Sequence, residues 1–399
     1  QQEKLKLGPK GRGLLALRRK SRQRFLRISV PAVLIAAAIV LIIIFQPFEL
    51  EIRPKTREAI ARENSIVVLP FENLMDPEDE TSQAGMATSL LTTALRESEY
   101  MNVVNEGRVN DVLRQMGRDE DRILSSETSE EVARRTGSNW ILTGKVIQSE
   151  PNIVLSATIA NATTGRDRWS GTVRSDVGED IFIAVDRLKA EIGKELALPP
   201  EAMAQLDRAV TSVTTSNPEA YRVYLLGNRE WNKLMWDDAA DHFQRAIELD
   251  STFALAYLRL AGMKWIICWE TGECEMDLVR MCYQKANEHA DKLSEILELE
   301  LEGFGKRLEG DFRGEIELLK QIVERDPQYK RVWSTLGDYS RILEGDQQEA
   351  IRYYSKVIEL DSTAALDYGW LAMSYAIVDD LDMAEWAADK YMSLEPDGV

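Results

Sequence analysis

The sequence contains few of the residues that most catalytic and metal sites require. Its 399 residues include three cysteines and two histidines, which leaves few ligands for zinc and few partners for a nucleophilic side chain. It also lacks a phosphate-binding loop of the form Gly-x-x-x-x-Gly-Lys-Ser/Thr and a kinase catalytic loop. We therefore expect no catalytic residue, no metal site and no cofactor in these residues, and we expect that the chain is not an enzyme.

Positive charge is scarce outside one short segment. The net charge is -18, from 49 basic and 67 acidic residues. Residues 1–27 contain ten Lys or Arg and one Glu, so the rest of the chain has 39 basic and 66 acidic residues and a net charge of -27. Such an acidic body repels phosphate backbones, so we expect no nucleic-acid partner. The length suggests two or three domains.

Long hydrophobic runs are also scarce, with one exception near the start. Residues 28–48 contain no charged side chain, and a helix of this length covers a hydrocarbon core of about 30 Å. Basic residues precede the segment and Glu49 and Glu51 follow it. The positive-inside rule then places residue 1 in the cytoplasm and the later residues outside. We predict a single transmembrane helix at 28–48 in a bacterial inner membrane, with the later domains periplasmic or extracellular.

A cleaved signal peptide is the alternative interpretation of this segment, because it also has a basic start and an apolar centre. Residues 45–48 read Phe-Gln-Pro-Phe and lack the small residues of a cleavage site, so we favour an uncleaved anchor. Residues 1–27 are then a basic juxtamembrane segment, and 49–63 are a linker. The chain begins with Gln1 and not with Met, so either it was trimmed or a larger cytoplasmic region precedes it.

Residues 64–198 alternate between strand and helix patterns. Apolar runs predict strands at 65–71, 101–104, 140–147, 153–160 and 168–174. Apolar residues that recur every three or four positions predict helices near 86–95, 109–116, 129–136 and 181–192. The order β-α-β-α-α-β-β-β-α describes a sheet with helices packed on it. The predicted class of the folded part is therefore α+β here and all-α after it.

Three segments of this domain resemble one known family. Residues 66–74, Ile-Val-Val-Leu-Pro-Phe-Glu-Asn-Leu, and the acidic turn after them resemble the amino-terminal TolB-like domain of bacterial envelope and signalling proteins. Residues 140–146 and 162–170 are similar to the later strands of that family. The resemblance implies an α/β sandwich that docks partners or senses a signal, with no settled catalytic role. Such domains often accompany a kinase, a nucleotide cyclase or a DNA-binding domain, and helical repeats.

Residues 218–399 repeat a pattern of small and aromatic side chains. The step from Ala350 to Ala384 is 34 residues, the length of one tetratricopeptide unit of two antiparallel helices. The region resembles the tetratricopeptide repeat (TPR) family, which implies an α-solenoid of helix pairs. We expect five units, at 220–253, 254–295, 296–329, 330–364 and 365–398, after a linker at 199–217. The second unit departs from the family pattern through an insertion near 269–275, and the third has Glu315 where the family usually has Ala.

Stacked TPR units form a concave face that binds extended peptides or helices. The groove positions of the family correspond here to Tyr221, Tyr224, Asn228, Trp231, Arg331, Ser334, Asp338 and Arg341. Their mixed aromatic, amide and charged character suits a protein or peptide partner. The alternative is that the three aromatic residues of this set pack against a neighbouring helix.

The cysteines lie near the insertion in the second unit. If this part of the chain is outside the cytoplasm, one pair among Cys268, Cys274 and Cys282 forms a disulfide and leaves one free thiol. The sequence leaves the pairing open. A zinc site would need a fourth ligand and more regular spacing, so we do not expect one.

Acidic and histidine residues indicate no further site. Asp76, Glu78, Asp79 and Glu80 lack the spacing of a calcium loop, and we expect a solvated turn. His242 and His289 fall on predicted helices beside repeat positions, where we expect surface or packing roles.

These features together predict a bacterial single-pass membrane protein whose outer part binds proteins. We expect the sensory or scaffold region of a signalling receptor, for which a Ser/Thr kinase domain before Gln1 is one hypothesis. The sequence leaves open whether a kinase or cyclase domain precedes Gln1. A standalone envelope scaffold that organises secretion or outer-membrane assembly is the alternative, and a cryptic hydrolase is a weaker one. The sequence leaves open the identity of the partner and whether the chain forms a homo-oligomer.

Overall fold

The computed structural model describes residues 56–75, 83–118, 123–233 and 235–394. The chain divides into two compact units, residues 1–54 and 55–399, and the described residues belong to the second. The basic segment 1–27, the predicted anchor 28–48 and the acidic run at 76–80 lie outside the described residues. Within the described ranges, no helix combines the length and the apolar character needed to span a membrane.

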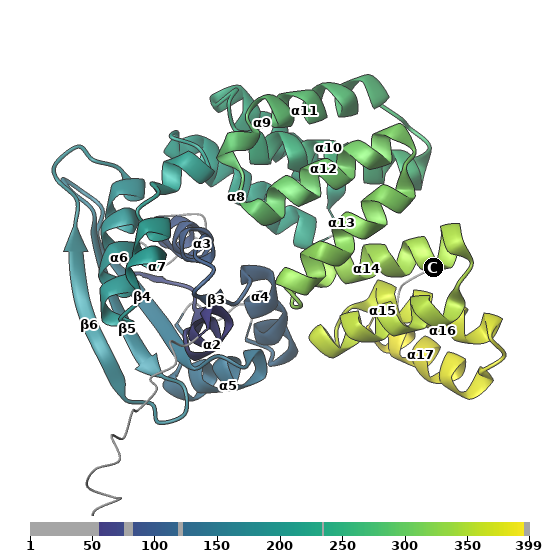
Figure 1. Cartoon of the computed structure of the whole chain (residues 1–399), viewed down its shortest axis with the longest axis horizontal. Coiled ribbons are helices and arrows are strands. Elements are labelled where there is room, and N and C mark those ends of the chain that lie inside the picture. The colour runs from purple at the N-terminus through teal and green to yellow at the C-terminus, as the bar shows by residue number, and fades with distance from the viewer. Residues whose placement is uncertain (1–55, 76–82, 119–122, 234, 395–399) are drawn as a thin grey trace, which may run out of the picture. The chain divides into compact units, whose positions relative to one another are not determined.

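The described unit begins with a mixed α/β domain, as the sequence predicts (Figure 1). Its strands are β1 Ser65–Val68, β2 Glu72–Asn73, β3 Asn102–Val103, β4 Trp140–Gln148, β5 Val154–Asn161 and β6 Asp167–Arg174. The strand order is β3-β1-β4-β5-β6, and β2 pairs with β4. The strand β1 is parallel to β3 and β4, because helical connections separate these strands in the chain. Short turns join β4, β5 and β6, which are antiparallel.

Helices cover both faces of the parallel part of the sheet. They are α3 Gln83–Arg96, α4 Glu106–Gln115, α5 Ser126–Thr136 and α6 Ile181–Glu195. Because strand residues alternate between faces, Val68 and Leu142 pack into one buried cluster with α3 and α6. Val67 and Ile141 pack into another cluster with α4 and α5. This two-sided covering places α3 and α4 on opposite faces of the sheet.

Two segments that the sequence suggests as linkers contain helices. Within 49–63, α2 runs from Arg57 to Glu63, and the Thr56 hydroxyl accepts a hydrogen bond from the Ala59 N–H. Within 199–217, the structure has α7 Pro200–Leu206 and a 3-10 turn at Val210–Val213. The second segment is packed and not free, because Leu206, Val210 and Val213 are buried. Short helices of this kind have too few turns to give a clear apolar period.

Between residues 218 and 394, in the part that the structure describes, five antiparallel helix pairs follow the α/β domain (Figure 1). They are α8 Pro218–Asn232 with α9 Trp236–Leu249, α10 Ala254–Thr271 with α11 Met276–Glu288, α12 Glu295–Glu309 with α13 Phe312–Arg325, α14 Lys330–Tyr339 with α15 Gln347–Leu360, and α16 Ala365–Ile377 with α17 Leu381–Leu394. A π-helical turn at Ser340–Glu344 extends α14. Glycine allows close approach inside two pairs: Gly227 lies against the Phe243 ring and Gly337 against the Tyr354 ring. This is the TPR type of packing that the repeat pattern indicates.

The irregular second pair contains the disulfide. Cys268, in the last turn of the long helix α10, is bonded to Cys274 in the loop before α11. Cys282 is buried on α11, and burial raises the pKa of its thiol to about 12. The free thiol is therefore shielded from reagents and protonated at neutral pH.

The close approach in the fourth pair gives a test of the packing. A Cβ added at Gly337 would lie 2.6 Å from the Tyr354 ring, whereas one at Gly262 on α10 would meet nothing within 4 Å. We expect Gly337→Ala to lower the free energy of unfolding by about 1–2 kcal/mol through overpacking. We expect Gly262→Ala to raise it by about 0.5–1 kcal/mol through lower backbone entropy in the unfolded chain. Urea unfolding of the two variants measures both values, and equal effects would contradict the packing.

Candidate partner-binding cleft and groove

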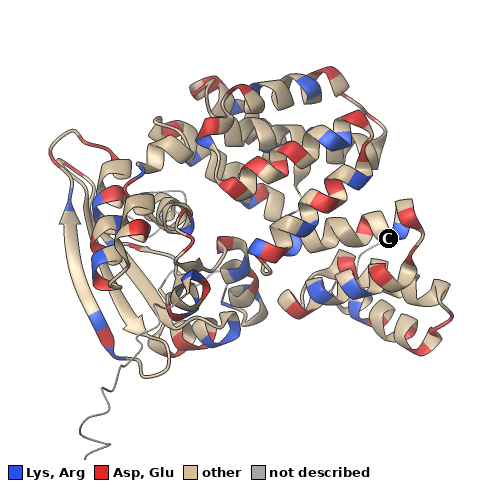
Figure 2. Ribbon diagram, viewed as in Figure 1, with Lys and Arg blue, Asp and Glu red and all other residues tan. Residues whose placement is uncertain are grey.

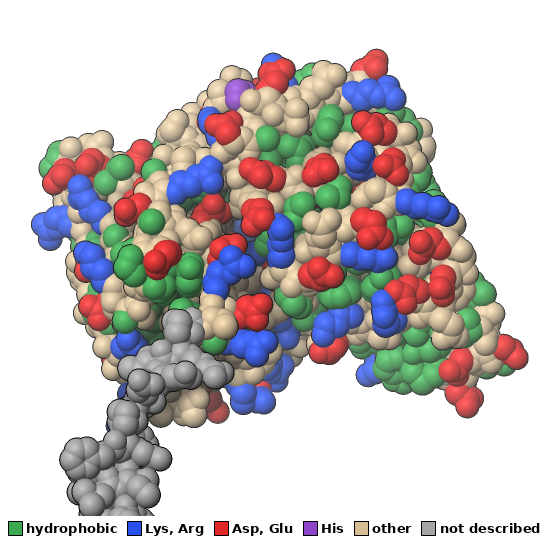
Figure 3. Space-filling model, viewed as in Figure 1, with side chains coloured by type: hydrophobic (Ala, Val, Ile, Leu, Met, Phe, Trp, Pro, Cys, Tyr) green, Lys and Arg blue, Asp and Glu red, His purple; other side chains and the backbone are tan. Residues whose placement is uncertain are grey.

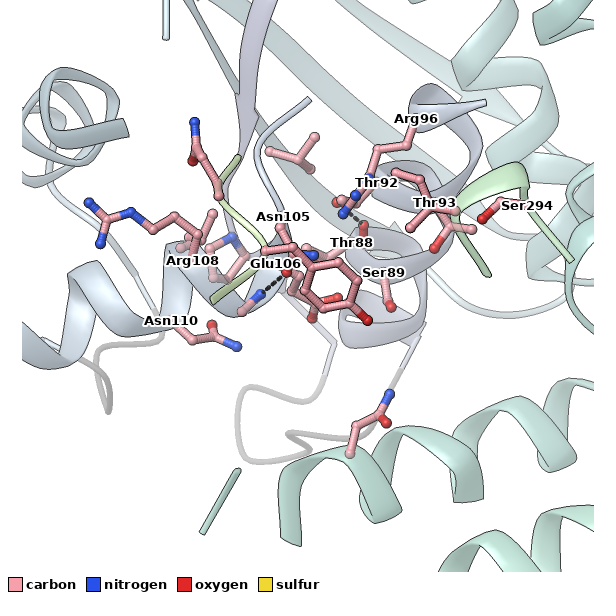
Figure 4. Close-up of a pocket in the computed structure, with 18 of the residues that line it drawn as sticks. Thr88, Ser89, Thr92, Thr93, Arg96, Asn105, Glu106, Arg108, Asn110 and Ser294 are labelled. Atoms are coloured by element: carbon pink, nitrogen blue, oxygen red, sulfur yellow. Dashed lines mark hydrogen bonds between the residues drawn. The ribbon is translucent and has the colours of Figure 1, made fainter. Parts of the chain in front are cut away.

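A cleft of about 1460 Å³ lies between the α/β domain and the helix pairs. Its first wall comes from α2, α3 and the start of α4, as the close-up in Figure 4 shows for α3 and α4. Its second wall comes mainly from the first helices of the pairs, α8, α10, α12 and α14. First helices line the concave side of a TPR solenoid, so the α/β domain faces that side.

Hydroxyl side chains form most of the α3 wall. They are Thr88, Ser89, Thr92 and Thr93 (Figure 4). The Thr88 hydroxyl donates to the Ala84 carbonyl over 2.9 Å and accepts from the Phe71 N–H over 2.9 Å. Arg96, one turn later, bonds to Asp326 at the end of α13 over 2.6 Å. The α3 wall is therefore polar and is fixed to the helix pairs at one end.

The start of α4 contributes a carboxyl group with an unusual environment. Asn105 caps the helix by accepting a hydrogen bond from the Gly107 N–H over 2.8 Å (Figure 4). Glu106 follows it, and burial raises the pKa of its carboxyl, while the Ser89 hydroxyl partly offsets this rise. The Tyr221 hydroxyl of α8 donates to Ser89 over 3.1 Å. The Tyr221–Ser89 bond joins α8 to α3, and Glu106 lines the same cleft at the start of α4.

The second wall has a row of alternating aromatic and charged side chains. The guanidinium groups of Arg259 and Arg331 lie 5.6 Å and 4.7 Å from the centre of the Trp231 ring. Both arginines bond to Glu300, and the Tyr329 hydroxyl donates to the same carboxylate over 3.1 Å. Burial alone would raise the pKa of Glu300, but the two arginines lower it to about 2. The side chains of this row are therefore bonded to one another, and they connect the first helices of four successive pairs, α8, α10, α12 and α14.

Four charged side chains, named here the charge cluster, join α4 to the helix pairs. Lys330 Nζ lies 2.6 Å from Asp361 Oδ2 and 2.9 Å from Asp111 Oδ1. Arg114 Nη2 lies 3.0 Å from Asp361 Oδ2 and 2.7 Å from Asp111 Oδ1. Figure 2 shows the two signs of charge together where α4 meets the start of α14. Burial opposes ionisation of both carboxyls, but Lys330 lowers the pKa of Asp361 strongly, whereas burial keeps the pKa of Asp111 above its usual value. The two carboxyls and the two cations are paired across the interface.

The residues that the sequence assigns to the groove divide into two groups. Tyr221, Tyr224, Asn228, Trp231 and Arg331 line the cleft, whereas the other three lie outside it. The two tyrosines are buried, and the Tyr224 ring lies 5.6 Å from Phe243 and 5.1 Å from Phe253, centre to centre. Both tyrosine rings therefore pack in the apolar space between helices, as the alternative describes, and both also border the cleft.

The remaining assigned residues lie beside a second surface on the last two pairs. Ser334 donates to Asp367 over 2.7 Å, and Asp338 accepts from the Tyr354 hydroxyl over 2.7 Å. The Arg341 guanidinium lies 4.3 Å from the centre of the Trp370 ring. These contacts hold the polar side of the surface in a fixed arrangement.

Apolar side chains complete this second surface. Ile342, Leu366, Met373 and Ile377 are exposed by 44%, 43%, 48% and 61%. Leu366, Met373 and Ile377 share one face of α16, because they are seven and four residues apart. We name this surface, with Ser334, Asp338 and Asp367, the open groove. Figure 3 shows hydrophobic side chains gathered at this end of the helical region.

The apolar members of the open groove were not assigned from the sequence, although a signal for them exists. Leu366 follows Arg331 by 35 residues, and the same step separates Met373 from Asp338 and Ile377 from Ile342. Carrying the assigned groove positions Arg331 and Asp338 from the fourth unit into the fifth would have found Leu366 and Met373, whereas Ile377 follows Ile342, which was not assigned. Among the described residues, no group of His, Cys, Asp and Glu is placed to hold a metal ion.

No family model matches the chain. Putative adenylate cyclase 3 of Rhizobium meliloti (strain 1021) is 27% identical over 202 residues, which are 49% of this chain and 32% of that protein. The chain therefore matches about a third of the length of that relative. The resemblance to TolB-like domains stays a prediction.

Several solved structures have local similarity to parts of the chain. The TPR protein YrrB, described as having an unusual peptide-binding site, is 19% identical and covers 45% of this chain and 87% of its own, with a TM-score of 0.27. A thermophilic TPR protein from Thermus thermophilus is 17% identical over 44% of this chain and 92% of its own, with a TM-score of 0.34. The LpoB C-terminal domain from Escherichia coli is 19% identical over 29% of this chain and 83% of its own, with a TM-score of 0.26. These scores are low, and the TPR interpretation depends on the helix pairing described above.

The paired row in the cleft predicts a pH-dependent contribution to stability. Because the folded-state pKa of Glu300 is about 2, its stabilising effect is present above the unfolded value of about 4.3 and is lost as pH falls toward 2. We expect Glu300→Gln to lower the free energy of unfolding by about 3 kcal/mol at pH 7, with a smaller difference from wild type at pH 3. Glu317→Gln, which removes an exposed pair with Lys320, should cost at most about 0.5 kcal/mol. Chemical unfolding at both pH values checks this, and a deficit that does not shrink with acid would contradict it.

The charge cluster predicts a local effect on α4. Asp361→Asn weakens the acceptor that Lys330 and Arg114 share, so amide hydrogen exchange in α4 should become about tenfold faster. Asp250→Asn is the matched control, because Asp250 forms the same hydrogen bonds to Thr252 that Asp361 forms to Thr363. The Asp250 side chain contacts Thr215 and not α4. Equal acceleration of α4 exchange in both variants would exclude a specific role for the charge cluster.

Proposed function

We propose that this chain is the protein-interaction region of a larger signalling protein and that its partner binds in the open groove. The proposal is based on one observation: the concave side has a part that the α/β domain covers and a part that stays exposed. The α/β domain faces the first helices of the earlier pairs, and the cleft wall there is closed by internal pairing among Trp231, Arg259, Glu300 and Arg331. The open groove has no such covering among the described residues, and its apolar side chains are exposed.

The chemistry of the open groove suits an amphipathic segment. The aligned Leu366, Met373 and Ile377 would take the apolar face of a partner helix or strand. Fully burying one such side chain contributes about 1.5–3 kcal/mol, and these are already about half buried. The summed burial free energy of the three side chains must also offset the entropy that the two molecules lose on association, so we expect an affinity in the micromolar range. The three apolar side chains would select a partner mainly by the fixed spacing between them, and they would contribute only modestly to affinity.

Similarity to a putative adenylate cyclase supports the signalling part of the proposal. The matched residues are a third of that protein, so any activity of the whole protein is proposed to reside in other residues. In this proposal the present chain binds and does not catalyse. It is anchored by residues 28–48 in a bacterial inner membrane, with the α/β domain and the helix pairs on the outer side, as the charge on each side of that segment predicts.

Site-specific photo-crosslinking in the native host tests the proposal. A photoreactive amino acid replaces Met373 in the open groove or, as the control, Met281 on α11, the second helix of its pair, where exposure is similar at 41% against 48%. We expect one protein to be captured through position 373 and not through position 281. The capture should disappear when Ile377→Glu is added, because a carboxylate then replaces an apolar contact.

Two outcomes would contradict the proposal. One is the capture of the same proteins through both positions, and the other is capture through position 373 that Ile377→Glu does not change. The melting temperature of each variant distinguishes a lost contact from a lost fold, and we expect Ile377→Glu to change it little, because Ile377 is 61% exposed.

A further inference from the structure

The carboxyl of Glu106 differs from the paired acidic groups of the cleft and also from Glu58 and Glu324, which are exposed. Asp111 bonds to Lys330, Glu295 to Arg325 and Glu99 to Arg57. Among the described residues, no Lys or Arg forms an ion pair with Glu106, and none contributes to its pKa, which burial raises. Glu106 is half-buried. A carboxyl group that is partly withdrawn from water and has no cation beside it is costly in its ionised form. The surroundings of Glu106 therefore lack the cation that an ionised carboxylate needs.

The groups around Glu106 would suit a positively charged nitrogen. The Ser89 hydroxyl of α3 lowers the pKa of the carboxyl and accepts a hydrogen bond from the Tyr221 hydroxyl of α8, and Asn228 of α8 also lines the cleft. The one cation of α3 in the cleft, Arg96, is bonded to Asp326. An anionic ligand would meet the carboxyl, whereas an ammonium or guanidinium group would find an anion and neutral acceptors. The acidic body of the chain also attracts cations.

We propose that Glu106, together with Ser89 and Tyr221, forms a binding site for a cationic nitrogen, either an alkylammonium or a guanidinium group. The carboxylate pairs with the cation, and the hydroxyl oxygens accept its remaining N–H bonds. The cleft is large and open enough to admit either a free polyamine or a Lys or Arg side chain of a bound polypeptide. This site is separate from the open groove and from the proposed function.

Ligand binding at this site is linked to proton release. A cation favours the ionised carboxyl, so a fraction of Glu106 that is protonated in the empty cleft loses its proton when the ligand binds. The groups that act on or interact with Glu106 are Ser89 of α3 and Tyr221 of α8, while the cation Arg96 of α3 is bonded to Asp326. Burial raises the pKa of Tyr221, so this tyrosine does not supply the proton. Affinity should therefore rise with pH across the titration of Glu106.

The experiment uses the full-length chain and two probes. One is spermidine, and the other is a fluorescent Ala/Gly peptide with a single central Arg; the same peptide with Glu at the centre is the negative control. Glu106→Gln keeps the size of the side chain and removes its charge. Glu58→Gln is the matched variant, because Glu58 is an exposed carboxylate that lines the same cleft. Calorimetry in two buffers of different ionisation enthalpy measures affinity and proton release.

We expect at least one cationic probe to bind with release of a fraction of a proton in the acidic range where Glu106 titrates. Glu106→Gln should weaken binding at least tenfold and abolish the proton release, and Glu58→Gln should change affinity less than twofold. Binding of spermidine alone identifies a free amine as the ligand, and binding of the Arg peptide alone identifies a polypeptide side chain. Absence of binding by both probes, or equal binding by wild type and Glu106→Gln, would overturn the proposal.

The melting temperature provides a second readout. A carboxyl whose pKa is raised by burial destabilises the fold when it is ionised, so Glu106→Gln should leave the melting temperature unchanged or raise it at pH 7. A large decrease would show a structural role for Glu106 and would also overturn the proposal. Photo-crosslinking through position 373 should be the same in Glu106→Gln and wild type. Failure of this cleft site is thereby distinguishable from failure of the open groove.

Discussion

The contact between α4 and the helix pairs is the constraint on which the rest of the arrangement depends. Asp111 and Arg114 meet Lys330 and Asp361 in the charge cluster, and Arg96 meets Asp326 at the end of α3. These pairs are partly withdrawn from water, so breaking one side would leave a charge without its partner. These ion pairs hold one face of the α/β domain against the first helices of the pairs. The cleft is the space that remains between the two regions in this arrangement.

This contact also divides the concave side into two parts with different chemistry. Near the α/β domain, the charges of the wall are paired internally, as in the row from Trp231 to Arg331, and the tyrosines of α8 are buried. On the last two pairs, apolar side chains are exposed beside Asp338 and Asp367. Burial raises the pKa of Asp367 to about 6, so the charge of the open groove changes near neutral pH. A partner therefore meets two surfaces that differ in polarity and in freedom to form new contacts.

Local patterns predict the elements well and the contacts between them poorly. The strands at 140–147, 153–160 and 168–174 and the helix pairs follow from periods of two and of three to four. The packing of Tyr221 and Tyr224 was an open alternative, because one position can face a groove or a neighbouring helix. The charge cluster had no local signal, since Arg114 and Asp361 are 247 residues apart. The environment of Glu106 likewise depends on side chains from three helices, and no spacing within one helix shows it.

The central claim is that the α/β domain is held at one fixed position against the helix pairs. The most direct measurement is a pulsed electron–electron distance between spin labels at the exposed positions Arg134 on α5 and Asp389 on α17. A thiol-reactive spin label should react with cysteines introduced at these two positions and not with the native ones, because Cys268 and Cys274 form a disulfide and Cys282 is buried. The account predicts one narrow distance distribution that broadens when Asp361→Asn is added. A distribution that is already broad in the otherwise unchanged chain would contradict it.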